Sequence, residues 1–177
     1  MSNNGHLSKS EWVSQIIDQH ESSLMRYAWL TGDPDQARDV VQDTFLRLCA
    51  EDPDDVQTYV VEWLFTVCRH RAVDLGRKEN RMKPLAELET ASQASDEPSP
   101  ALAAERADAA NHVLQALHGL PANQQEVVRL KFQCGLSYKE ISRVTNLTVT
   151  NVGFLLHSAL KTLRRELRTE FGLNKVH

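Results

Sequence analysis

The sequence is poor in cysteine, and the cysteines it has are not arranged in motifs. Cys49, Cys68 and Cys134 are odd in number and widely spaced, and no CxxC or HxxxH arrangement occurs. This spacing indicates neither a disulfide framework nor a zinc site. We therefore expect reduced thiols in or near a core, with no bound metal and no cofactor.

Long apolar runs and catalytic motifs are also missing. No run approaches the roughly 18 apolar residues of a membrane-spanning helix, and the polar start MSNNGHLSKSE lacks the apolar segment of a signal peptide. We expect a cytoplasmic protein with no membrane contact. No nucleophile stands beside a base at motif spacing and no phosphate-binding glycine loop occurs, so we do not expect an enzyme.

Charge is unevenly distributed along the chain. The formal net charge of -4 argues against a protein that coats nucleic acid indiscriminately. Residues 1–82 hold 9 Lys or Arg against 14 Asp or Glu, whereas residues 101–177 hold 10 against 6. Residues 83–100 are rich in Pro, Ser, Ala and acidic residues, which predicts a flexible acidic linker. The asymmetry suggests a C-terminal nucleic-acid face and a separate face for a basic protein partner.

The segment 136–167 has the pattern of two short helices joined by a tight turn. Ser137 followed by Glu140 is a capping box, which predicts the start of a helix. That helix must end by Asn146, a residue that tolerates left-handed backbone, and Thr148 can cap the next helix. The second helix has one apolar stripe at steps of three and four residues, made of Val152, Leu155, Leu156, Ala159 and Leu163. The segment therefore predicts a helix-turn-helix.

The opposite face of the second helix is polar at its start and basic at its end. Its residues are Thr150, Asn151, Gly153, Phe154, His157, Lys161, Arg164, Arg165 and Arg168. In a helix-turn-helix the start of the second helix enters the major groove, while cations neutralise phosphates. The alternative is a plain helical hairpin with a solvated basic face, and this pattern alone does not separate the two.

Three helices are predicted in the N-terminal part. Ser10 can cap the first, and Asp33–Pro34 supplies the cap and the first-turn proline of the second. Helices joined this tightly pack antiparallel. The run at residues 51–58 is predicted to be a loop, and the third helix occupies residues 59–83. The stripe of the second helix consists of Ala37, Val40, Val41, Thr44, Phe45 and Leu48.

The third helix combines aromatic residues with a basic end. Tyr59, Trp63 and Phe65 precede Arg69, His70, Arg77, Lys78 and Arg81. Aromatic rings that stack on bases, together with cations that pair with phosphates, suit single-stranded nucleic acid. The alternative is a core helix with snorkelling arginines, and for Trp63 and Phe65 core packing is the favoured interpretation.

A further helix is predicted over residues 101–120. Its apolar positions are Leu102, Ala109, Val113, Leu114 and Leu117. Gly119-Leu120-Pro121 ends it, and no strand-like alternation occurs anywhere in the chain. The prediction is an all-α protein of two small helical domains, residues 1–82 and 101–177, joined by the acidic linker 83–100.

Three segments in a fixed order bear a resemblance to a known family. They are DVVQDTFLRL at residues 39–48, WLFTVCRHRAVDLGRK at 63–78 and LPANQQEVVRLKFQCGLSYKEIS at 120–142. Together they resemble the extracytoplasmic-function (ECF) sigma factors of bacterial RNA polymerase, over nearly the whole chain. The resemblance implies a sigma-two domain, a sigma-four helix-turn-helix domain and no sigma-three domain between them. It also implies transcription initiation at promoters, often restrained by an anti-sigma factor.

The resemblance assigns a role to each polar face. The second helix would dock on the coiled coil of the polymerase beta-prime subunit through Asp39, Gln42, Asp43 and Arg47. The third helix and the loop before it would capture the unpaired strand of the minus-ten element through Tyr59, Trp63, Arg69, His70, Arg77 and Lys78. The helix-turn-helix would touch the beta flap and read the minus-thirty-five element through Thr148, Thr150, Asn151, Phe154, His157, Lys161 and Arg164.

The docking motif departs from the family pattern. Family members usually read Asp-Ala-Glu-Asp, whereas this chain has Gln36, Ala37, Arg38 and Asp39. Two carboxylates are missing, and each charge pair at a protein rim contributes about 0 to 1 kcal/mol. Some branches restore such charge by phosphorylation through a Ser/Thr kinase. Thr58 is the candidate acceptor here, and Thr44 is expected to be hidden.

The reading helix departs as well. Family members commonly carry Lys or Arg at the positions of Gly153, Leu155 and Ser158, and phosphate contacts set most of the affinity for duplex DNA. We expect weaker duplex binding here. Alternatively, Phe154 and Leu155 form an apolar patch that docks on a protein. The chain would then be a sigma-like adaptor or helix-turn-helix regulator that relies on a partner for DNA targeting.

Overall fold

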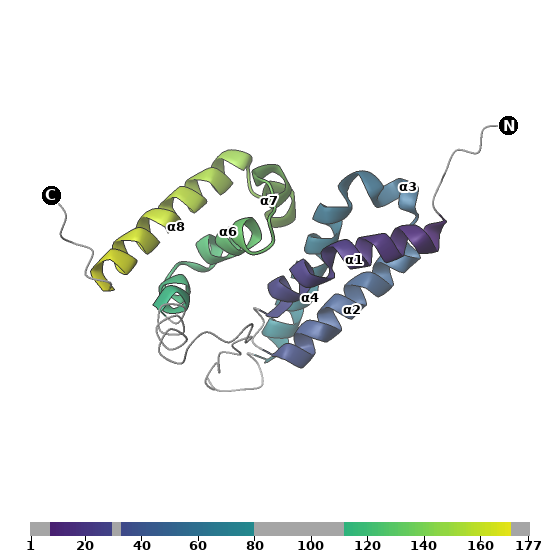
Figure 1. The fold of residues 1–177 in the computed structure, drawn as a ribbon, viewed down its shortest axis with the longest axis horizontal. Coiled ribbons are helices and arrows are strands. Elements are labelled where there is room, and N and C mark those ends of the chain that lie inside the picture. The colour runs from purple at the N-terminus through teal and green to yellow at the C-terminus, as the bar shows by residue number, and fades with distance from the viewer. Residues whose placement is uncertain (1–7, 30–32, 80–111, 171–177) are drawn as a thin grey trace, which may run out of the picture.

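The computed structural model describes residues 8–29, 33–79 and 112–170, with the backbone alone for residues 76–79 and 170. All regular secondary structure in these ranges is helical, which confirms the all-α prediction; the predicted linker lies outside them. The elements are α1 (Lys9–Ala28), α2 (Pro34–Ala50), α3 (Pro53–Val56), η2 (Gln57–Tyr59), α4 (Val60–Glu79), a helical stretch at residues 112–118, α6 (Ala122–Phe132), α7 (Tyr138–Thr145) and α8 (Val149–Glu170) (Figure 1).

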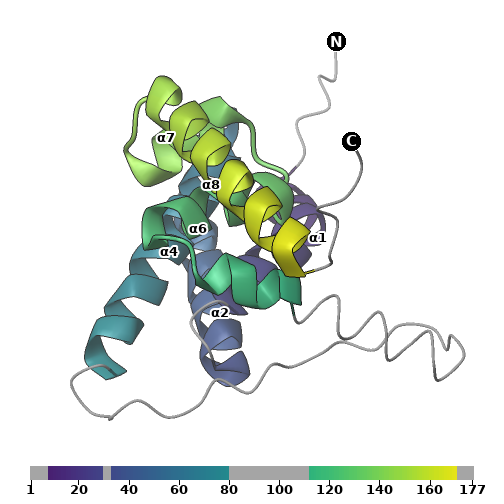
Figure 2. The ribbon, with the colours of Figure 1, turned by 90° about the vertical axis from the view of Figure 1, so that its left-hand side faces the viewer.

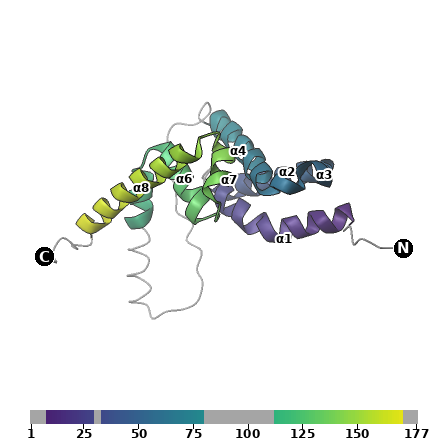
Figure 3. The ribbon, with the colours of Figure 1, turned by 90° about the horizontal axis from the view of Figure 1, so that it is seen from above.

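The helices from α1 to α4 form an N-terminal unit. α1 and α2 lie side by side in opposite directions, as their short connection predicts, and α4 packs against both (Figures 1 and 3). All six predicted stripe residues of α2 are buried. Thr44 is hidden, as predicted, because its hydroxyl donates a hydrogen bond of 2.8 Å to the carbonyl of Val40 inside the core.

The predicted cap of α1 is wrong by two residues. The N-cap is Ser8, and Ser10 lies within the first turn. The hydroxyl of Ser8 accepts a hydrogen bond from the amide of Glu11, and the Glu11 carboxylate accepts one of 2.8 Å from the amide of Ser8. This capping box satisfies two backbone donors, whereas Ser10 has no glutamate or glutamine three residues later.

The predicted loop at residues 51–58 is also wrong, because most of it is helical. Asp52 caps α3 by accepting a hydrogen bond of 3.1 Å from the amide of Asp54, and Pro53 occupies the first turn. This start signal matches the one formed by Asp33 and Pro34 at α2. Val56 is buried and anchors the stretch to the core, and η2 then leads directly into α4.

Residues 112–170 form a C-terminal unit that contains the predicted helix-turn-helix. Ser137 and Glu140 make the predicted capping box, and Asn146 ends α7 in the left-handed conformation with φ 58°. α8 packs against α6 and α7 (Figure 2) through the predicted stripe, all of which is buried. The stripe predicted for residues 101–120 is wrong at Val113 and Leu114, which are exposed, and its members Leu102 and Ala109 lie outside the described residues.

The buried positions at the end of that predicted helix are Ala116 and Leu120 instead. The thiols divide in a similar way. Cys68 is buried and Cys134 is half-buried, as expected for near-core thiols, but Cys49 is exposed. Burial raises the pKa of the Cys68 thiol to about 12 and that of Cys134 to about 11, so both remain protonated and poorly nucleophilic at neutral pH.

The two units pack against each other. Their buried side chains form one continuous apolar cluster. α7 lies where the units meet and packs against α4 (Figure 3). The tertiary structure therefore places the helix-turn-helix beside the helix to which the family resemblance assigned the unpaired DNA strand.

Candidate nucleic-acid and polymerase interfaces

The polar face of α8 is open to solvent along its length. Thr150, Asn151 and His157 are exposed, and 67% of the surface of Phe154 is exposed. Thr148 is exposed too, but its hydroxyl accepts a hydrogen bond of 3.1 Å from the amide of Asn151, so it caps the helix as predicted. These side chains project from the start of the second helix, the part that contacts base edges in a helix-turn-helix.

The expected apolar patch on this face does not form. Leu155 is only 6% exposed and belongs to the buried stripe, so Phe154 has no apolar partner from that position. The reason is the helical period, because adjacent residues lie about 100° apart and the stripe needs Leu155 together with Leu156. This removes Leu155 from the features that favoured the adaptor interpretation, whereas Phe154 remains exposed.

The second half of α8 is cationic. Lys161 and Arg164, both predicted DNA contacts, are exposed and line a shallow groove together with His157, Leu160, Arg165, Arg168 and Thr169. Within the described part of the chain none of these cations makes an ion pair. Unpaired cations on one helix face are suited to binding phosphates.

The predicted strand-capture face lies on η2 and α4. Tyr59 is 41% exposed and Trp63 is half-buried against the core. Phe65 is fully buried and stacks edge-on against Tyr27 at 5.7 Å, so the core interpretation is correct for this ring. His70 is exposed. Arg77 and Lys78 belong to the last turns of α4, and their side chains lie outside the described residues.

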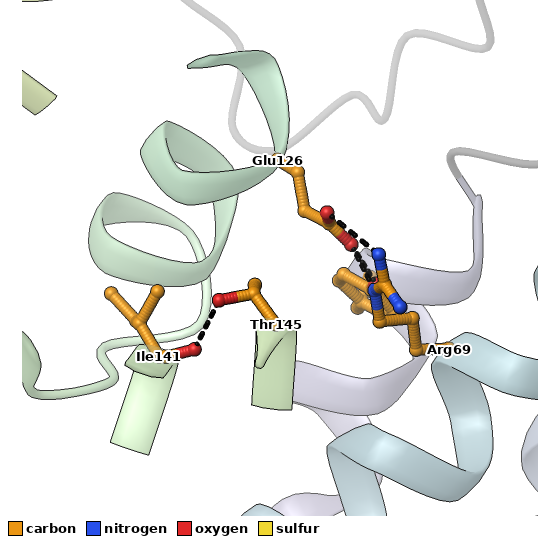
Figure 4. A network of polar contacts seen from close by, with 5 residues as sticks. Arg69, Glu126, Ile141 and Thr145 are labelled. Carbon is orange, nitrogen blue, oxygen red and sulfur yellow. Dashed lines mark hydrogen bonds and ion pairs between the residues drawn. The ribbon is translucent and has the colours of Figure 1, made fainter. Parts of the chain in front are cut away.

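Arg69 is engaged by a residue of the other unit. Its Nε and Nη2 donate hydrogen bonds of 2.7 and 3.3 Å to the two carboxylate oxygens of Glu126 on α6 (Figure 4). The hydroxyl of Tyr27 donates a third bond of 3.0 Å to the same carboxylate. Hydrogen bonding to Glu126 raises the pKa of Arg69, and burial, followed by the nearby Glu126 charge, raises that of Tyr27 well above its usual value.

Sequence reasoning did not find Glu126 or Tyr27. Glu126 lies 57 residues from Arg69 in the chain, so no local spacing links the two residues. Figure 4 also shows the internal bond by which the Thr145 hydroxyl donates to the carbonyl of Ile141, at 2.7 Å, near the end of α7.

The predicted polymerase-binding residues of α2 are of two kinds. Asp39 and Gln42 are exposed. Asp43 is half-buried and lies 2.7 Å from Arg71 on α4 and 3.2 Å from Arg47, so it links α2 to α4. The face available to a partner is therefore centred on Asp39 and Gln42.

In the docking motif that differs from the family pattern, Arg38 forms an ion pair with Asp35 at 3.3 Å. Both side chains of this pair are well exposed, and such pairs contribute little to stability.

Among the described helices, none combines the length and the apolar character that a membrane span requires. The residues that the structure describes also contain no group of three or more side chains placed to hold a metal ion.

Comparison with known proteins bears directly on this arrangement. Two family models match: Sigma-70 region 2 over residues 16–82 and Sigma-70, region 4 over residues 111–163. The ECF RNA polymerase sigma factor SigL of Mycobacterium tuberculosis is 31% identical over 166 residues, covering 90% of each protein. The ECF RNA polymerase sigma factor SigW of Bacillus subtilis is 24% identical over 165 residues, covering 88% of each.

Solved structures agree on the fold. CnrH, determined in complex with the cytosolic domain of CnrY, has a TM-score of 0.60 and 25% identity, covering 89% of this chain and 88% of CnrH. The sigma factor RpoE of Bartonella quintana, determined with the anti-sigma factor NepR, has a TM-score of 0.68 and 22% identity, covering 88% of this chain and 96% of that one.

The fold and the exposed face of α8 define a helix-turn-helix protein built from sigma-70 regions 2 and 4. The chain belongs to the ECF sigma factors of RNA polymerase, since it shares 31% identity with SigL over nearly the full length of both. It is an alternative sigma factor, and the family resemblance read from the three sequence segments is confirmed.

Proposed function

We propose that this sigma factor divides its work between its two units. The N-terminal unit, from the predicted domain 1–82, binds core polymerase and an unpaired DNA strand. The C-terminal unit, from the predicted domain 101–177, positions the assembly on duplex DNA. The sigma factor would act in the cytoplasm and catalyse no reaction itself, since the polymerase supplies the chemistry of RNA synthesis. The observation that carries the proposal is that regions 2 and 4 match the two units in chain order, and that each unit has its own polar face.

Polymerase docking falls to α2. Asp39 and Gln42 are exposed on that helix and are available to the basic coiled coil of the beta-prime subunit. Asp43 and Arg47 contribute less, because Asp43 is already paired inside the unit. With two carboxylates missing from the family motif, we expect docking to depend more on shape and apolar contact than on charge.

Strand capture falls to η2 and α4. The exposed ring of Tyr59 and the half-buried ring of Trp63 border one groove, which also contains Thr58, Glu62, Thr66 and Val67. A base removed from the duplex stacks on such rings, and cations such as Arg69, His70, Arg77 and Lys78 pair with its phosphates. Binding energy of this kind offsets the few kcal/mol lost by unstacking, so no nucleotide hydrolysis is needed.

Duplex reading at the minus-thirty-five element falls to α8. Thr150, Asn151 and His157 are the side chains that reach base edges, and Phe154 is suited to contact a thymine methyl group. Lys161 and Arg164 lie further along the exposed face and bind phosphates. Asn151→Ala and His157→Ala should each abolish a minus-thirty-five footprint, whereas an unchanged footprint would mean that a protein partner directs the chain to DNA.

Regulation completes the proposal. Two sigma factors of the same fold were solved with CnrY and with the anti-sigma factor NepR, so we expect an anti-sigma protein to restrain this chain as well. Thr58 is exposed in the groove beside Arg143, as an acceptor for a kinase must be. Mass spectrometry of the transcriptionally active protein would remove Thr58 as a phosphosite if it found no phosphate there.

Run-off transcription tests the function as a whole. Purified chain is added to core polymerase with a library of promoter fragments, and the RNA products are sequenced. We expect transcripts that begin at a shared promoter motif and that depend on the chain. Failure to join core polymerase, in either the phosphorylated or the unphosphorylated form, would contradict the proposal.

A further inference from the structure

The far end of α8 carries cations for which the proposed function has no ligand. Arg165 and Arg168 are exposed, line the groove on this helix, and form no ion pair with any described residue. This end of α8 extends away from the N-terminal unit (Figures 1 and 3). Its cations are therefore far from the face proposed for the unpaired DNA strand.

The duplex read by the start of α8 does not account for these two arginines. The 22 residues of the helix span about 33 Å, whereas the major groove is about 12 Å wide. Arg168 lies about 26 Å along the helix axis from Asn151. Arg165 points about 100° away from its neighbour Arg164, which we assigned to a duplex phosphate. Distance excludes one arginine from the duplex, and direction excludes the other.

The cationic groove continues around the end of the helix. Arg165 and Thr169 also line a second hollow, whose other wall includes Gln115 of the helical stretch at residues 112–118. Glu166 is the carboxylate in that hollow and is half-buried. A flexible single strand can follow such a curved path, whereas a straight duplex cannot.

The lining of the groove favours nucleic acid over protein as its ligand. Leu160 is the one aliphatic residue in it, and no Phe, Tyr or Trp lines it. Protein interfaces have an apolar centre with aromatic anchors, whereas nucleic-acid interfaces are more polar and more positively charged. The phosphate backbone is therefore the ligand that these side chains fit.

We propose that the distal groove of α8, defined by Arg165, Arg168 and Thr169, binds the backbone of single-stranded RNA, the product of the transcribing assembly. The inference rests on the proposed function, which assigns duplex DNA to the start of α8 and the unpaired DNA strand to α4, so that RNA is the nucleic acid left. The arginines donate hydrogen bonds to phosphate oxygens. The Thr169 hydroxyl already donates to the carbonyl of Arg165 at 3.0 Å, and its oxygen can accept a bond from a ribose 2′-hydroxyl.

Arg165→Gln combined with Arg168→Gln removes both cations and leaves the length of the side chains nearly unchanged. Fluorescence anisotropy of a labelled random-sequence single-stranded RNA pool measures binding to the full chain at several salt concentrations. Each phosphate contact to a single strand contributes about 0.7 to the slope of log K against log salt, so the slope should fall by about 1.4. Relative to binding near 1 M salt, this is a loss of about 25-fold near 0.1 M.

A matched control separates the groove from a general loss of charge. Lys9→Gln combined with Lys139→Gln changes the net charge equally, at two exposed positions outside the groove. This control should keep the wild-type slope. An equal fall in both double variants would contradict a site in the groove.

Crosslinking in a halted transcription complex identifies the strand that occupies the groove. One arm carries 4-thiouridine in the RNA, and the other carries 4-thiothymidine in the non-template DNA strand. We expect crosslinks to the end of α8 from the RNA, reduced in the Arg165→Gln, Arg168→Gln variant. Crosslinks from the DNA strand alone would overturn the assignment to RNA.

The remaining outcomes separate this site from the proposed function. The Arg165→Gln, Arg168→Gln variant should keep its minus-thirty-five footprint, and loss of that footprint would assign both arginines to duplex DNA. A wild-type slope for RNA together with weaker binding to core polymerase would instead mean that the groove docks an acidic protein. The proposed reading of duplex DNA is tested independently, by Asn151→Ala and His157→Ala at the start of α8.

Discussion

The two helices that we propose to contact DNA, α4 and α8, differ in how far their polar residues already have partners. On α4, Arg69 is bound by Glu126, and Glu62 by Arg143, so part of the face proposed for the unpaired strand is engaged by the other unit. On α8, the side chains from Thr150 to Arg164 that face away from the core form no ion pair with any described residue. The face proposed for duplex DNA is therefore open, whereas two polar side chains of the face proposed for the unpaired strand already have partners in the other unit.

This difference matches the order of events in promoter opening. Duplex DNA is present from the start, whereas an unpaired strand exists only once the polymerase has begun to melt the promoter. A strand-binding face that stayed open in the free protein would bind any single-stranded nucleic acid, because stacking and phosphate contacts are tolerant of sequence.

The largest effect should come from breaking the core that supports the face proposed for the unpaired strand. Phe65→Ala removes a fully buried ring that stacks on Tyr27, the donor to Glu126. We expect the free energy of unfolding to fall by about 3–5 kcal/mol, measured by urea denaturation. The control is Phe132→Ala on α6, where the ring is 60% exposed and the change should stay within about 0.5 kcal/mol. Equal losses in both variants would contradict this account of the core.

Two capping boxes of the same kind allow the units to be compared directly. Ser137→Ala at α7 and Ser8→Ala at α1 should each reduce stability by about 1 kcal/mol, since each leaves a backbone amide without its acceptor. Only Ser137→Ala should also weaken binding to duplex DNA, because α7 supports the position of α8. Gel-shift titration measures this binding. A similar loss of duplex binding in Ser8→Ala would show that the effect is one of general stability.

Binding of duplex DNA to the open face of α8 can be tested by adding a cation to that face. A Cβ at Gly153 would lie 3.6 Å from the nearest atom of the Tyr138 ring, an ordinary contact, so Gly153→Lys fits without rearrangement. One additional phosphate contact should steepen the dependence of log K on log salt by about 0.9 for duplex DNA. Titration of a short random-sequence duplex at several salt concentrations measures the slope. Gly153→Gln, which adds length without charge, should leave the slope unchanged.

The smallest effect concerns pH. Burial lowers the pKa of His20 on α1, while the nearby Glu140 of α7 partly opposes the shift. A group with a lowered pKa resists protonation in the packed state. At high pH, His20 is neutral in both the folded and the unfolded chain and adds no pH dependence to stability. As the pH falls below the ordinary pKa of 6.5, protonation of His20 in the unfolded chain destabilises the folded chain.

Urea unfolding from about pH 8 to about pH 5 measures this dependence, across the range in which histidine changes charge. His20→Gln should flatten the slope that is due to this residue. A variant as sensitive to acid as the wild type would assign the slope to other groups.

Local signals in the sequence were enough for most of the helices. The stripes of α2 and α8 were predicted residue by residue, because each depends on a period of about 3.6 residues that is visible in the sequence. The capping box at Ser137 and the left-handed Asn146 were also found, since their partners lie within four residues. The errors at Ser8 and at α3 arose from signals of the same kind that were overlooked, namely Ser8 with Glu11 and Asp52 with Pro53.

The candidate site was only partly predictable. Every predicted residue of α8 lies on the exposed face, but its Leu155 patch does not form. Arg69 was assigned to DNA without its partner, because nothing near Glu126 in the sequence distinguishes it from a glutamate on a solvated face. Asp43 was assigned to polymerase, whereas its nearest cation is Arg71 on a neighbouring helix.

The sequence by itself determined the helices, their buried stripes and the order of regions that marks a sigma factor. All of these depend on spacing along the chain, which folding does not change. Only the tertiary structure decided which charged side chains are available to DNA or polymerase. An arginine that binds a carboxylate in another unit has the same local sequence as one that faces water, and the difference lies in packing between segments far apart in the chain.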